Sequence, residues 1–324
     1  MEKGLRMKKD TLGTVVLLGA GITAGILTLS DLLFRFACQR NLPKHRPRRK
    51  KTEDDHGMGK YGELMKEGAH WFRSMDYKEV VIESGDGLRL TGYFLKKPKA
   101  KQTILCVHGY RGHGIEDFGY IAKFYYKHDS NVLIIDQRAN TKSEGNYITF
   151  GAKECKDVAQ WAWKIHDDIA PNKPIILDGV SMGATSVLLA TGELLPKSVK
   201  GVIADCGFTS AKEEIEYVAR NMFHLPKYPF LPLIEFLCHR RAGFTFEDTN
   251  VKNRLKHNKL PILFVHGGRD DFVPTIMSAK NYIACKSKKY LEIVDDAKHA
   301  MSYMVEEKRC QKWLLEFIDE CLKK

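Results

Sequence analysis

Ser181 lies in a sequence context that can present a nucleophile. It is the centre of Gly179-Val180-Ser181-Met182-Gly183, which follows a short apolar run at 174–178 and precedes a small-residue helical pattern at 184–190. A strand, a sharp turn and a helix would expose the serine at the strand end, with glycines where a side chain would clash. Free N–H groups at the helix start would face a developing oxyanion. Alone, the pentapeptide also fits a flexible surface turn, so the rest of the chain has to decide.

A serine nucleophile needs two further groups. Its hydroxyl reacts well only when a base takes its proton, and an imidazole base needs a carboxylate to fix its tautomer and stabilise its cation. Two later turns of the chain supply these residue types. One is His266-Gly267-Gly268-Arg269-Asp270-Asp271-Phe272-Val273-Pro274, and the other is Lys298-His299. Both follow predicted strands, so the sequence favours a site assembled from several strand ends.

From residue 79 onward, short apolar runs alternate with longer helical patterns. Two alternating runs at 79–83 and 88–95 form a predicted hairpin. Further strands are predicted at 103–107, 132–135, 175–180, 199–204, 262–266 and 291–294, and helices near 115–128, 151–169, 182–195, 211–223, 275–285 and 300–322. Apolar strands separated by helices indicate an α/β domain with a mostly parallel sheet and helices on both faces. Ligands of such sheets bind beyond the carboxyl ends of the strands.

A long insertion interrupts this alternation at about 208–258. It is apolar, aromatic and punctuated by proline. Connections of this length in compact domains are usually functional, and we expect a helical lid over the site. Extra core packing under a surface loop is the alternative, and the two are compatible. The residues expected to meet substrate are Phe208, Met222, Phe223, Tyr228 and Phe230.

The N-terminal segment is predicted to be a membrane anchor. Residues 11–30 carry no charge, and at about 1.5 Å per residue they reach across roughly 30 Å, the hydrocarbon thickness of a bilayer. Gly21 and Gly25 form a small-xxx-small pattern that suits close helix packing. A cleaved signal peptide is disfavoured because the run is long and no A-x-A site closes it. We therefore divide the chain into an anchor at 1–40, with its span at about 11–33, a basic linker and lead-in at 41–77, and a main domain at 78–324.

The charge of the chain is concentrated beside this span. The formal net charge is +12, and residues 1–51 hold 12 Lys/Arg against 3 Asp/Glu. The larger share follows the span, which predicts a single-pass protein with its main domain in the cytoplasm and a basic run against anionic headgroups. The body is nearly balanced and has no zinc-finger spacing or recognition helix, so nucleic-acid binding is not expected. The eight cysteines form no C-x-x-C, which agrees with a reducing compartment.

The ordered landmarks resemble those of the α/β-hydrolase superfamily, and within it serine-aminopeptidase-like and acyl-thioesterase-like hydrolases. The resemblance covers roughly 78–322. It rests on His108-Gly109-Tyr110, the loop at 136–145, the Ser181 pentapeptide, the His266–Pro274 turn and Lys298-His299. It implies an α/β-hydrolase fold, a mostly parallel sheet with helices on both faces and a helical lid insertion. The loop at 136–145 departs from the family pattern at Thr141, where glycine is commoner.

The resemblance also assigns roles to the residues. Ser181 would be the nucleophile, His299 the base and Asp270 the carboxylate, with Asp271 and Asp205 as alternatives to Asp270. The oxyanion would be held by the backbone N–H groups of Met182 and Tyr110. His108 and His266 would be structural hydrogen-bonding residues. We expect no metal and no cofactor, because no H-E-x-x-H, P-loop or dinucleotide motif occurs.

The sequence thus predicts a membrane-anchored serine hydrolase that cleaves a carboxylic ester or thioester of a small-molecule or lipid-like acyl substrate. Two alternatives stay open. One is a serine peptidase of the aminopeptidase type, in which lid carboxylates would hold a substrate amine; Glu213, Glu214 and Glu216 could supply them. The other is a non-catalytic, membrane-tethered interaction module on the same scaffold.

Overall fold

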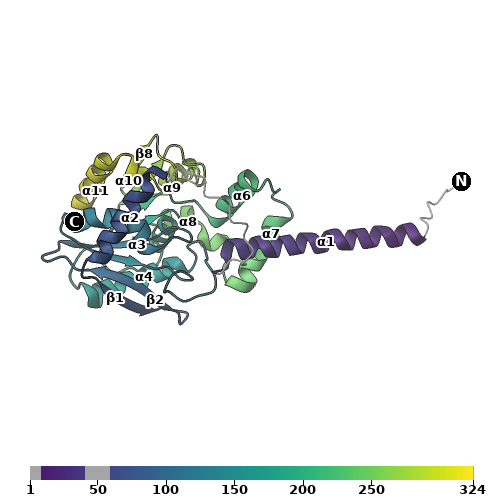
Figure 1. The fold of residues 1–324 in the computed structure, drawn as a ribbon, viewed down its shortest axis with the longest axis horizontal. Helices are drawn as coiled ribbons and strands as arrows, with labels where there is room; N and C mark the ends of the chain where they lie inside the picture. The colour runs from purple at the N-terminus through teal and green to yellow at the C-terminus, as the bar shows by residue number, and fades with distance from the viewer. Residues whose placement is uncertain (1–8, 41–58, 324) are drawn as a thin grey trace.

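The computed structural model describes residues 9–40 and 59–323, and its centre is one eight-stranded sheet. The strand order is β1-β2-β4-β3-β5-β6-β7-β8 (Figure 1). The β1–β2 and β2–β4 pairs are antiparallel and all other pairs are parallel. The bounds are β1 Lys78–Glu83, β2 Arg89–Leu95, β3 Gln102–Val107, β4 Ser130–Ile135, β5 Ile175–Val180, β6 Val199–Asp205, β7 Ile262–Gly267 and β8 Lys289–Val294. Each strand matches a predicted one, and the mostly parallel α/β sheet is confirmed.

Helices cover both faces of the sheet, as a sheet buried on both sides requires. Every residue of β3 and β4 is buried, which agrees with the apolar runs 104–107 and 132–135 that fill most of these strands. One face packs against α2 (Gly59–Ser74), α3 (Gly114–Lys127) and α11 (Glu307–Leu322). The other packs against α4 (Glu154–Lys164), α5 (Met182–Ala190), α8 (Val251–Leu255) and α9 (Ile276–Ala284). The predicted helix at 151–169 ends in a π-helical turn, Ile165–Ile169, and that at 300–322 divides into α10 (Ser302–Val305) and α11.

Helix α2 was not predicted, because it falls in the segment expected to be linker and lead-in. It crosses α3 in close contact at two glycines. A Cβ on Gly68 would lie 2.4 Å from the Cα of Tyr120, and one on Gly119 would lie 2.7 Å from the Ala69 nitrogen. Phe72 and Ala69 are also buried on its inner face. The expected basic linker at 41–58 lies outside the described residues.

The lid insertion is helical. It contains α6 (Ala211–Met222), α7 (Phe230–Leu237), a π-helical turn at Cys238–Ala242, a 3-10 turn at Glu247–Thr249 and α8. Ser210 caps α6, and its side chain accepts the N–H of Glu213. The inner side of the insertion forms one hydrophobic cluster with the end of α1, and we call this the lid cluster. Its buried members include Phe34, Cys38, Ile148, Phe150, Met182, Phe208, Leu231, Ile234, Cys238, Phe244 and Val273.

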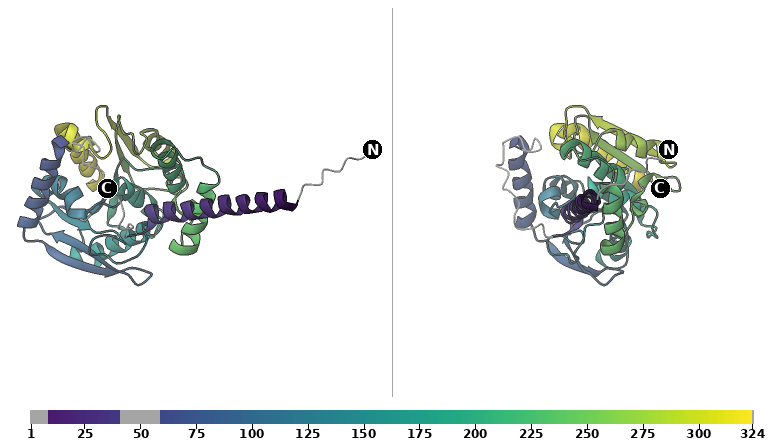
Figure 2. Two further views of the ribbon diagram at one scale, coloured as in Figure 1. Left: turned by 45° about the vertical axis from the view of Figure 1, so that its right-hand side comes forward. Right: turned by 90° about the vertical axis from the view of Figure 1, so that its right-hand side faces the viewer.

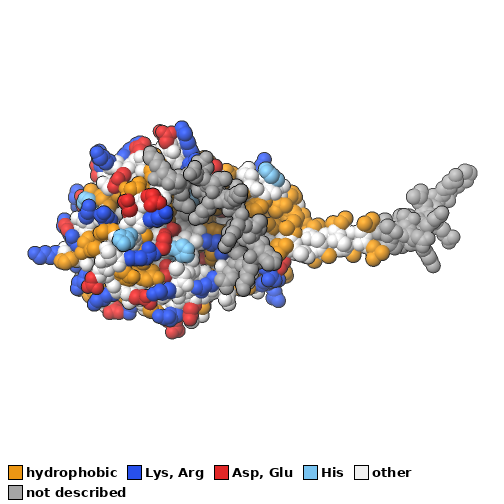
Figure 3. Space-filling view, in the orientation of Figure 1, with side chains coloured by type: hydrophobic (Ala, Val, Ile, Leu, Met, Phe, Trp, Pro, Cys, Tyr) orange, Lys and Arg blue, Asp and Glu red, His pale blue; other side chains and the backbone are white. Residues whose placement is uncertain are grey.

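Helix α1 (Lys9–Cys38) leaves the body beside α7 and projects far beyond it (Figures 1 and 2). The stretch Leu17–Cys38 is 22 residues long with a mean hydropathy of 1.7, sufficient by length and composition to cross a membrane. Leu17, Leu18 and Ile22 are exposed, and apolar side chains run along the projecting part (Figure 3). From Ser30 to Cys38 the helix packs on the body, so only its last turns belong to the globular fold.

A pH dependence of stability follows from Asp178, a buried carboxylate in β5. Burial raises its pKa to about 7, although the Tyr125 hydroxyl donates a hydrogen bond to it at 2.7 Å. In the unfolded chain an aspartate titrates near 3.9. Because the folded pKa is the higher one, stability is lost as pH rises between these values.

We predict that Asp178→Asn is more stable than the unsubstituted protein above about pH 7, by up to about 4 kcal/mol, and no more stable near pH 4. The amide stays neutral and its oxygen still accepts from Tyr125. Urea unfolding in detergent micelles, followed by circular dichroism at both pH values, measures the difference. An equal stability difference at both pH values would contradict this reading of Asp178.

Candidate active site

The backbone at Ser181 has a conformation that few side chains adopt. Its φ is 56° and its ψ is −119°, in the tight turn between β5 and α5. The turn closes because its flanking residues lack side chains. A Cβ on Gly183 would lie 1.9 Å from the Val107 carbonyl oxygen, and one on Gly179 would lie 2.4 Å from the Gly183 backbone. These contacts hold the turn against the end of β3, and they explain the glycines of the pentapeptide.

Ser181, His299 and Asp270 form one line of hydrogen bonds. The Ser181 Oγ lies 2.9 Å from the His299 Nε2, and the His299 Nδ1 lies 2.7 Å from the Asp270 Oδ2. The three residues follow β5, β8 and β7, so the parallel sheet brings their turns to one edge. In this tautomer Nδ1–H donates to the carboxylate and Nε2 accepts from the serine hydroxyl. The structure therefore brings together the three side chains that the sequence singled out.

Asp270 is almost completely enclosed and accepts four hydrogen bonds. The N–H groups of Phe272 and Val273 donate to Oδ1 at 3.0 and 2.9 Å, while His299 and His266 donate to Oδ2. Burial alone would raise the pKa of this carboxyl, but the bonds from His266 and His299 outweigh it and hold the pKa well below its ordinary value. Asp270 therefore stays ionised beside His299.

His266 is the residue whose role the sequence only outlined. Its Nε2 lies 3.0 Å from the Asp270 Oδ2 and 2.9 Å from the Val273 carbonyl oxygen, and its Nδ1 lies 2.6 Å from the Ser278 Oγ. It is fully buried and contacts the same carboxylate oxygen as His299. The spacing of four residues to Asp270 was the only sequence signal for this contact.

The other carboxylates considered lie differently. Asp271 is exposed, and its carbonyl oxygen accepts from the Tyr217 hydroxyl at 3.2 Å. The Asp205 side chain accepts from the Ser302 Oγ at 3.4 Å, and its carbonyl oxygen accepts the Ser181 N–H at 2.8 Å. Burial raises the pKa of Asp205 to about 6. Asp205 thus supports the serine turn through its backbone, whereas the side chain bonded to His299 is that of Asp270.

The two expected oxyanion donors flank Ser181. Met182 begins α5, so its N–H is among the first four of the helix, which have no partner within it. On the other side, a Cβ on Gly109 would lie 3.4 Å from the Ser181 Cβ, so the Gly109–Tyr110 backbone runs beside the nucleophile. The Tyr110 hydroxyl donates to the Phe36 and Ala37 carbonyl oxygens at 3.1 and 2.8 Å. The Tyr110 side chain thus binds α1, and the role of its backbone N–H as an oxyanion donor stays a prediction.

The lid covers the site unevenly. Phe208 is buried in the lid cluster and Phe230 packs against it. By contrast, Met222, Phe223 and Tyr228 lie at the surface, with exposed fractions of 45%, 45% and 69%. Ser181 itself is only 6% exposed. A substrate therefore reaches the serine only if part of the lid moves.

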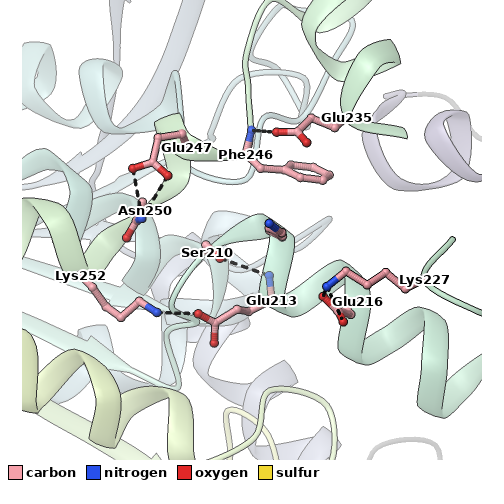
Figure 4. Close-up of a pocket in the computed structure, with 10 residues that line it drawn as sticks. Ser210, Glu213, Glu216, Lys227, Glu235, Phe246, Glu247, Asn250 and Lys252 are labelled. Atoms are coloured by element: carbon pink, nitrogen blue, oxygen red, sulfur yellow. Dashed lines mark hydrogen bonds and ion pairs between the residues drawn. The ribbon is translucent and has the colours of Figure 1, made fainter. Parts of the chain in front are cut away.

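A separate charged cavity of about 410 Å³ lies on the lid (Figure 4). Its side chains are largely committed to one another: Lys252 pairs with Glu213 at 2.6 Å and Lys227 with Glu216 at 2.8 Å. It has neither the apolar wall nor the free polar groups of a typical ligand pocket. The lining residues are Ser210, Lys212, Glu213, Glu216, Lys227, Glu235, Phe246, Glu247, Asn250 and Lys252.

A metal ion fits poorly at the serine site. Cys206, Asp270 and His299 each bring one ligand atom within 4.8 Å of the others. However, the Asp270 Oδ2 and both ring nitrogens of His299 already form hydrogen bonds. Burial also raises the pKa of the Cys206 thiol well above its ordinary value, whereas metals bind the thiolate. The donor set suits proton transfer better than ion binding.

Comparison with known proteins agrees with the fold. Residues 98–232 match the family of serine aminopeptidases, S33. The chain is 28% identical over 248 residues to the uncharacterized protein YqkD of Bacillus subtilis, covering 76% of this chain and 81% of that one. It is 25% identical over 221 residues to the uncharacterized membrane protein YNL320W of Saccharomyces cerevisiae, covering 66% and 70%.

Among solved structures, the esterase Pf2001 of Pyrococcus furiosus superposes with a TM-score of 0.63 and 25% identity. The superposition covers 77% of this chain and 94% of the esterase. The family match, the relatives and the superposition all agree with an α/β-hydrolase fold. The chain belongs to the α/β-hydrolase superfamily.

Proposed function

We propose that this protein is a serine hydrolase in which Ser181, His299 and Asp270 form a catalytic triad. The observation that carries the proposal is the unbroken line from the Ser181 Oγ through both His299 nitrogens to the Asp270 Oδ2, at 2.9 and 2.7 Å. Two further features support it. The strained backbone of Ser181 is costly for stability unless function requires it. Asp270, held ionised, is the carboxylate that an imidazole base needs.

The geometry suits acyl transfer through an acyl-enzyme. The Ser181 Oγ attacks the acyl carbonyl carbon, and its proton passes to the His299 Nε2. The imidazolium is stabilised by Asp270 and protonates the departing alcohol or thiol. The carbonyl oxygen becomes an oxyanion between the N–H groups of Met182 and Tyr110. Water then attacks the acyl-enzyme with His299 as base, which releases the acid and restores Ser181.

Esters and thioesters are the substrate class that the site favours. The surroundings of Ser181 are apolar, because Met182 and Phe208 belong to the lid cluster. Peptidase activity on a free amine would need lid carboxylates, yet Glu213 pairs with Lys252 and Glu216 with Lys227. Glu214 is buried and its carboxylate has no hydrogen-bond partner among the described residues, but burial raises its pKa well above the ordinary value, which favours the neutral acid. A neutral carboxyl is a weak partner for an ammonium group.

We also propose that α1 anchors the enzyme as a single span, with the catalytic domain in the cytoplasm. The length and hydropathy of α1 and the similarity to a membrane protein of yeast support the anchor. The excess of Lys and Arg after the span, most of it at 44–51 and outside the described residues, supports the orientation. All eight cysteines are buried, which agrees with a reducing compartment without demanding one.

Ser181→Ala is expected to abolish labelling by a fluorophosphonate probe and to lower kcat/KM for p-nitrophenyl esters by about 10³-fold or more, because the nucleophile is lost. In-gel fluorescence and an absorbance assay on the purified full chain measure both. Ser186→Ala is the matched control. It lies in the same helix, where its hydroxyl bonds only the Met182 carbonyl and the Gln137 side chain.

The same assay separates the alternatives. Equal labelling of the Ser181→Ala variant would leave an interaction module on a hydrolase scaffold as the better account. Faster turnover of aminoacyl amides than of esters would replace the esterase by the peptidase.

Asp270→Asn should lower kcat by about 10³- to 10⁴-fold, because an amide beside His299 stabilises neither the required tautomer nor the imidazolium. Asp271→Asn is the neighbouring control and should change kcat less than about threefold, since its side chain is exposed and away from the imidazole. Ester hydrolysis at saturating substrate compares the two. The assignment of Asp270 fails if both variants lose activity equally.

The orientation predicts that a cysteine placed at the exposed Lys308 stays unlabelled by a membrane-impermeant maleimide in intact cells and reacts after permeabilisation. The buried native cysteines keep the background low. Gel-shift quantification of the labelled fraction measures the result. Full labelling in intact cells would place the domain on the outer side.

A further inference from the structure

The part of α1 that stands free of the body is no longer than a bilayer is thick. Among residues 17–38, for which burial is described, Ser30 is the first buried one, and the helix before it projects from the body (Figure 1). At about 1.5 Å per residue the 21 positions at 9–29 reach roughly 30 Å, the thickness of the hydrocarbon core. Asp31 is the first charged residue after the uncharged stretch at 11–30. No helical stalk therefore separates the body from the membrane surface.

The lid is fastened to the helix at that level. Arg241 forms an ion pair with Asp31, and its guanidinium lies 5.5 Å from the centre of the Phe34 ring. One turn further along, the Cys38 and Cys238 sulfurs lie 3.7 Å apart in a buried contact. These contacts join α1 to the segment that follows α7, so the end of the span fixes the position of the lid.

The outer face of the lid carries large apolar side chains that the fold does not bury. Tyr228 is 69% exposed, Phe236 59%, and Met222 and Phe223 45% each. The Phe223 ring touches that of Phe36 on α1, with centroids 5.7 Å apart. Figure 3 shows apolar side chains gathered where α1 leaves the body. An apolar surface continuous with a membrane span marks contact with lipid.

This surface is connected to Ser181 through apolar side chains. The lid cluster includes Phe34 and Cys38 from α1, Ile234 from α7, and Met182, which directly follows the nucleophile. Tyr110 packs against the same cluster and donates its hydroxyl to α1. An acyl chain moving from the bilayer to the serine would thus stay among apolar side chains throughout.

We propose that the outer face of the lid, formed by Met222, Phe223, Tyr228 and Phe236, inserts into the bilayer surface, and that the acyl chain of a membrane lipid passes along the lid cluster to Ser181 when the part of the lid that Cys238 and Arg241 do not fasten to α1 moves. The lipid contact does not depend on the proposed hydrolase activity, whereas the entry of the acyl chain rests on it. The lid residues expected from the sequence to line the substrate then divide in two: Phe208 and Phe230 face the acyl chain, and the exposed ones face lipid headgroups and upper acyl carbons.

Lipid contact can be measured without any activity. Full-length protein carrying Phe236→Trp is reconstituted into phosphatidylcholine–phosphatidylglycerol vesicles, with or without brominated acyl chains that quench nearby indoles. The emission contributed by the new tryptophan should be lost in the brominated vesicles. Tyr228→Trp provides a second position in case the first variant folds poorly.

Leu194→Trp is the matched control. Leu194 is 82% exposed, and it precedes β6 at the opposite edge of the sheet from Ser181. Its emission should be the same in both kinds of vesicle. Equal quenching of lid and control positions, or none at either lid position, overturns the membrane contact.

Entry from the bilayer is tested by comparing two esters. A palmitoyl ester embedded in the vesicles and p-nitrophenyl acetate in solution are assayed with the reconstituted protein and with Phe236→Asp. The ratio of turnover on the embedded ester to that on the soluble ester should fall about tenfold in the variant, because a charge replaces an apolar contact with lipid. An unchanged ratio overturns entry from the bilayer. If neither ester is hydrolysed, the proposed function is overturned instead. The quenching experiment still tests the lipid contact in that case.

Discussion

The structure depends on one backbone constraint, the turn that holds Ser181 at positive φ. The turn fits only because Gly183 can approach the Val107 carbonyl and Gly179 can approach Gly183. That approach is possible because β3 and β5 are neighbours in the parallel sheet. The order of the central strands therefore determines where the nucleophile stands, and the turns after β7 and β8 bring the carboxylate and the imidazole to it. The strain at one residue is sustained by the packing of the whole sheet.

Asp270 is a buried carboxylate that its surroundings keep ionised. Removing Asp270 from water disfavours its ionised form, and only the bonds from two histidines and two backbone amides reverse that preference. The proposed mechanism uses one of those bonds, to His299. The bond from His266 takes no part in the proposed proton transfer. It stabilises the negative charge of Asp270, which would in turn stabilise an imidazolium at His299.

The fold and the proposed triad could be predicted from the sequence because their signals are local. Most strands contain a short apolar run, and Ser181, Asp270 and His299 each follow a strand. Helix α2 was missed because its buried inner face consists of Gly68, Ala69 and Phe72, and two of these three residues are small and give little apolar signal in the sequence. The pairing of Cys38 with Cys238 was missed for a different reason. Cys38 and Cys238 are 200 residues apart, and the residue pattern of either segment does not predict a contact with the other.

That long-range contact changes the meaning of the N-terminal helix. Read as sequence, α1 is an anchor joined to a catalytic domain by a linker, and the two parts are independent. In the structure its last turns are core: Phe34 and Cys38 are buried in the lid cluster, and Tyr110 and Arg111 bind its final carbonyl groups. If α1 spans a membrane as proposed, a helix that faces lipid over one part and forms core over the next would not shift along its axis without exposing one of them. On that proposal the membrane would set the position of the lid over Ser181, and anchoring and substrate access would be a single property of the fold.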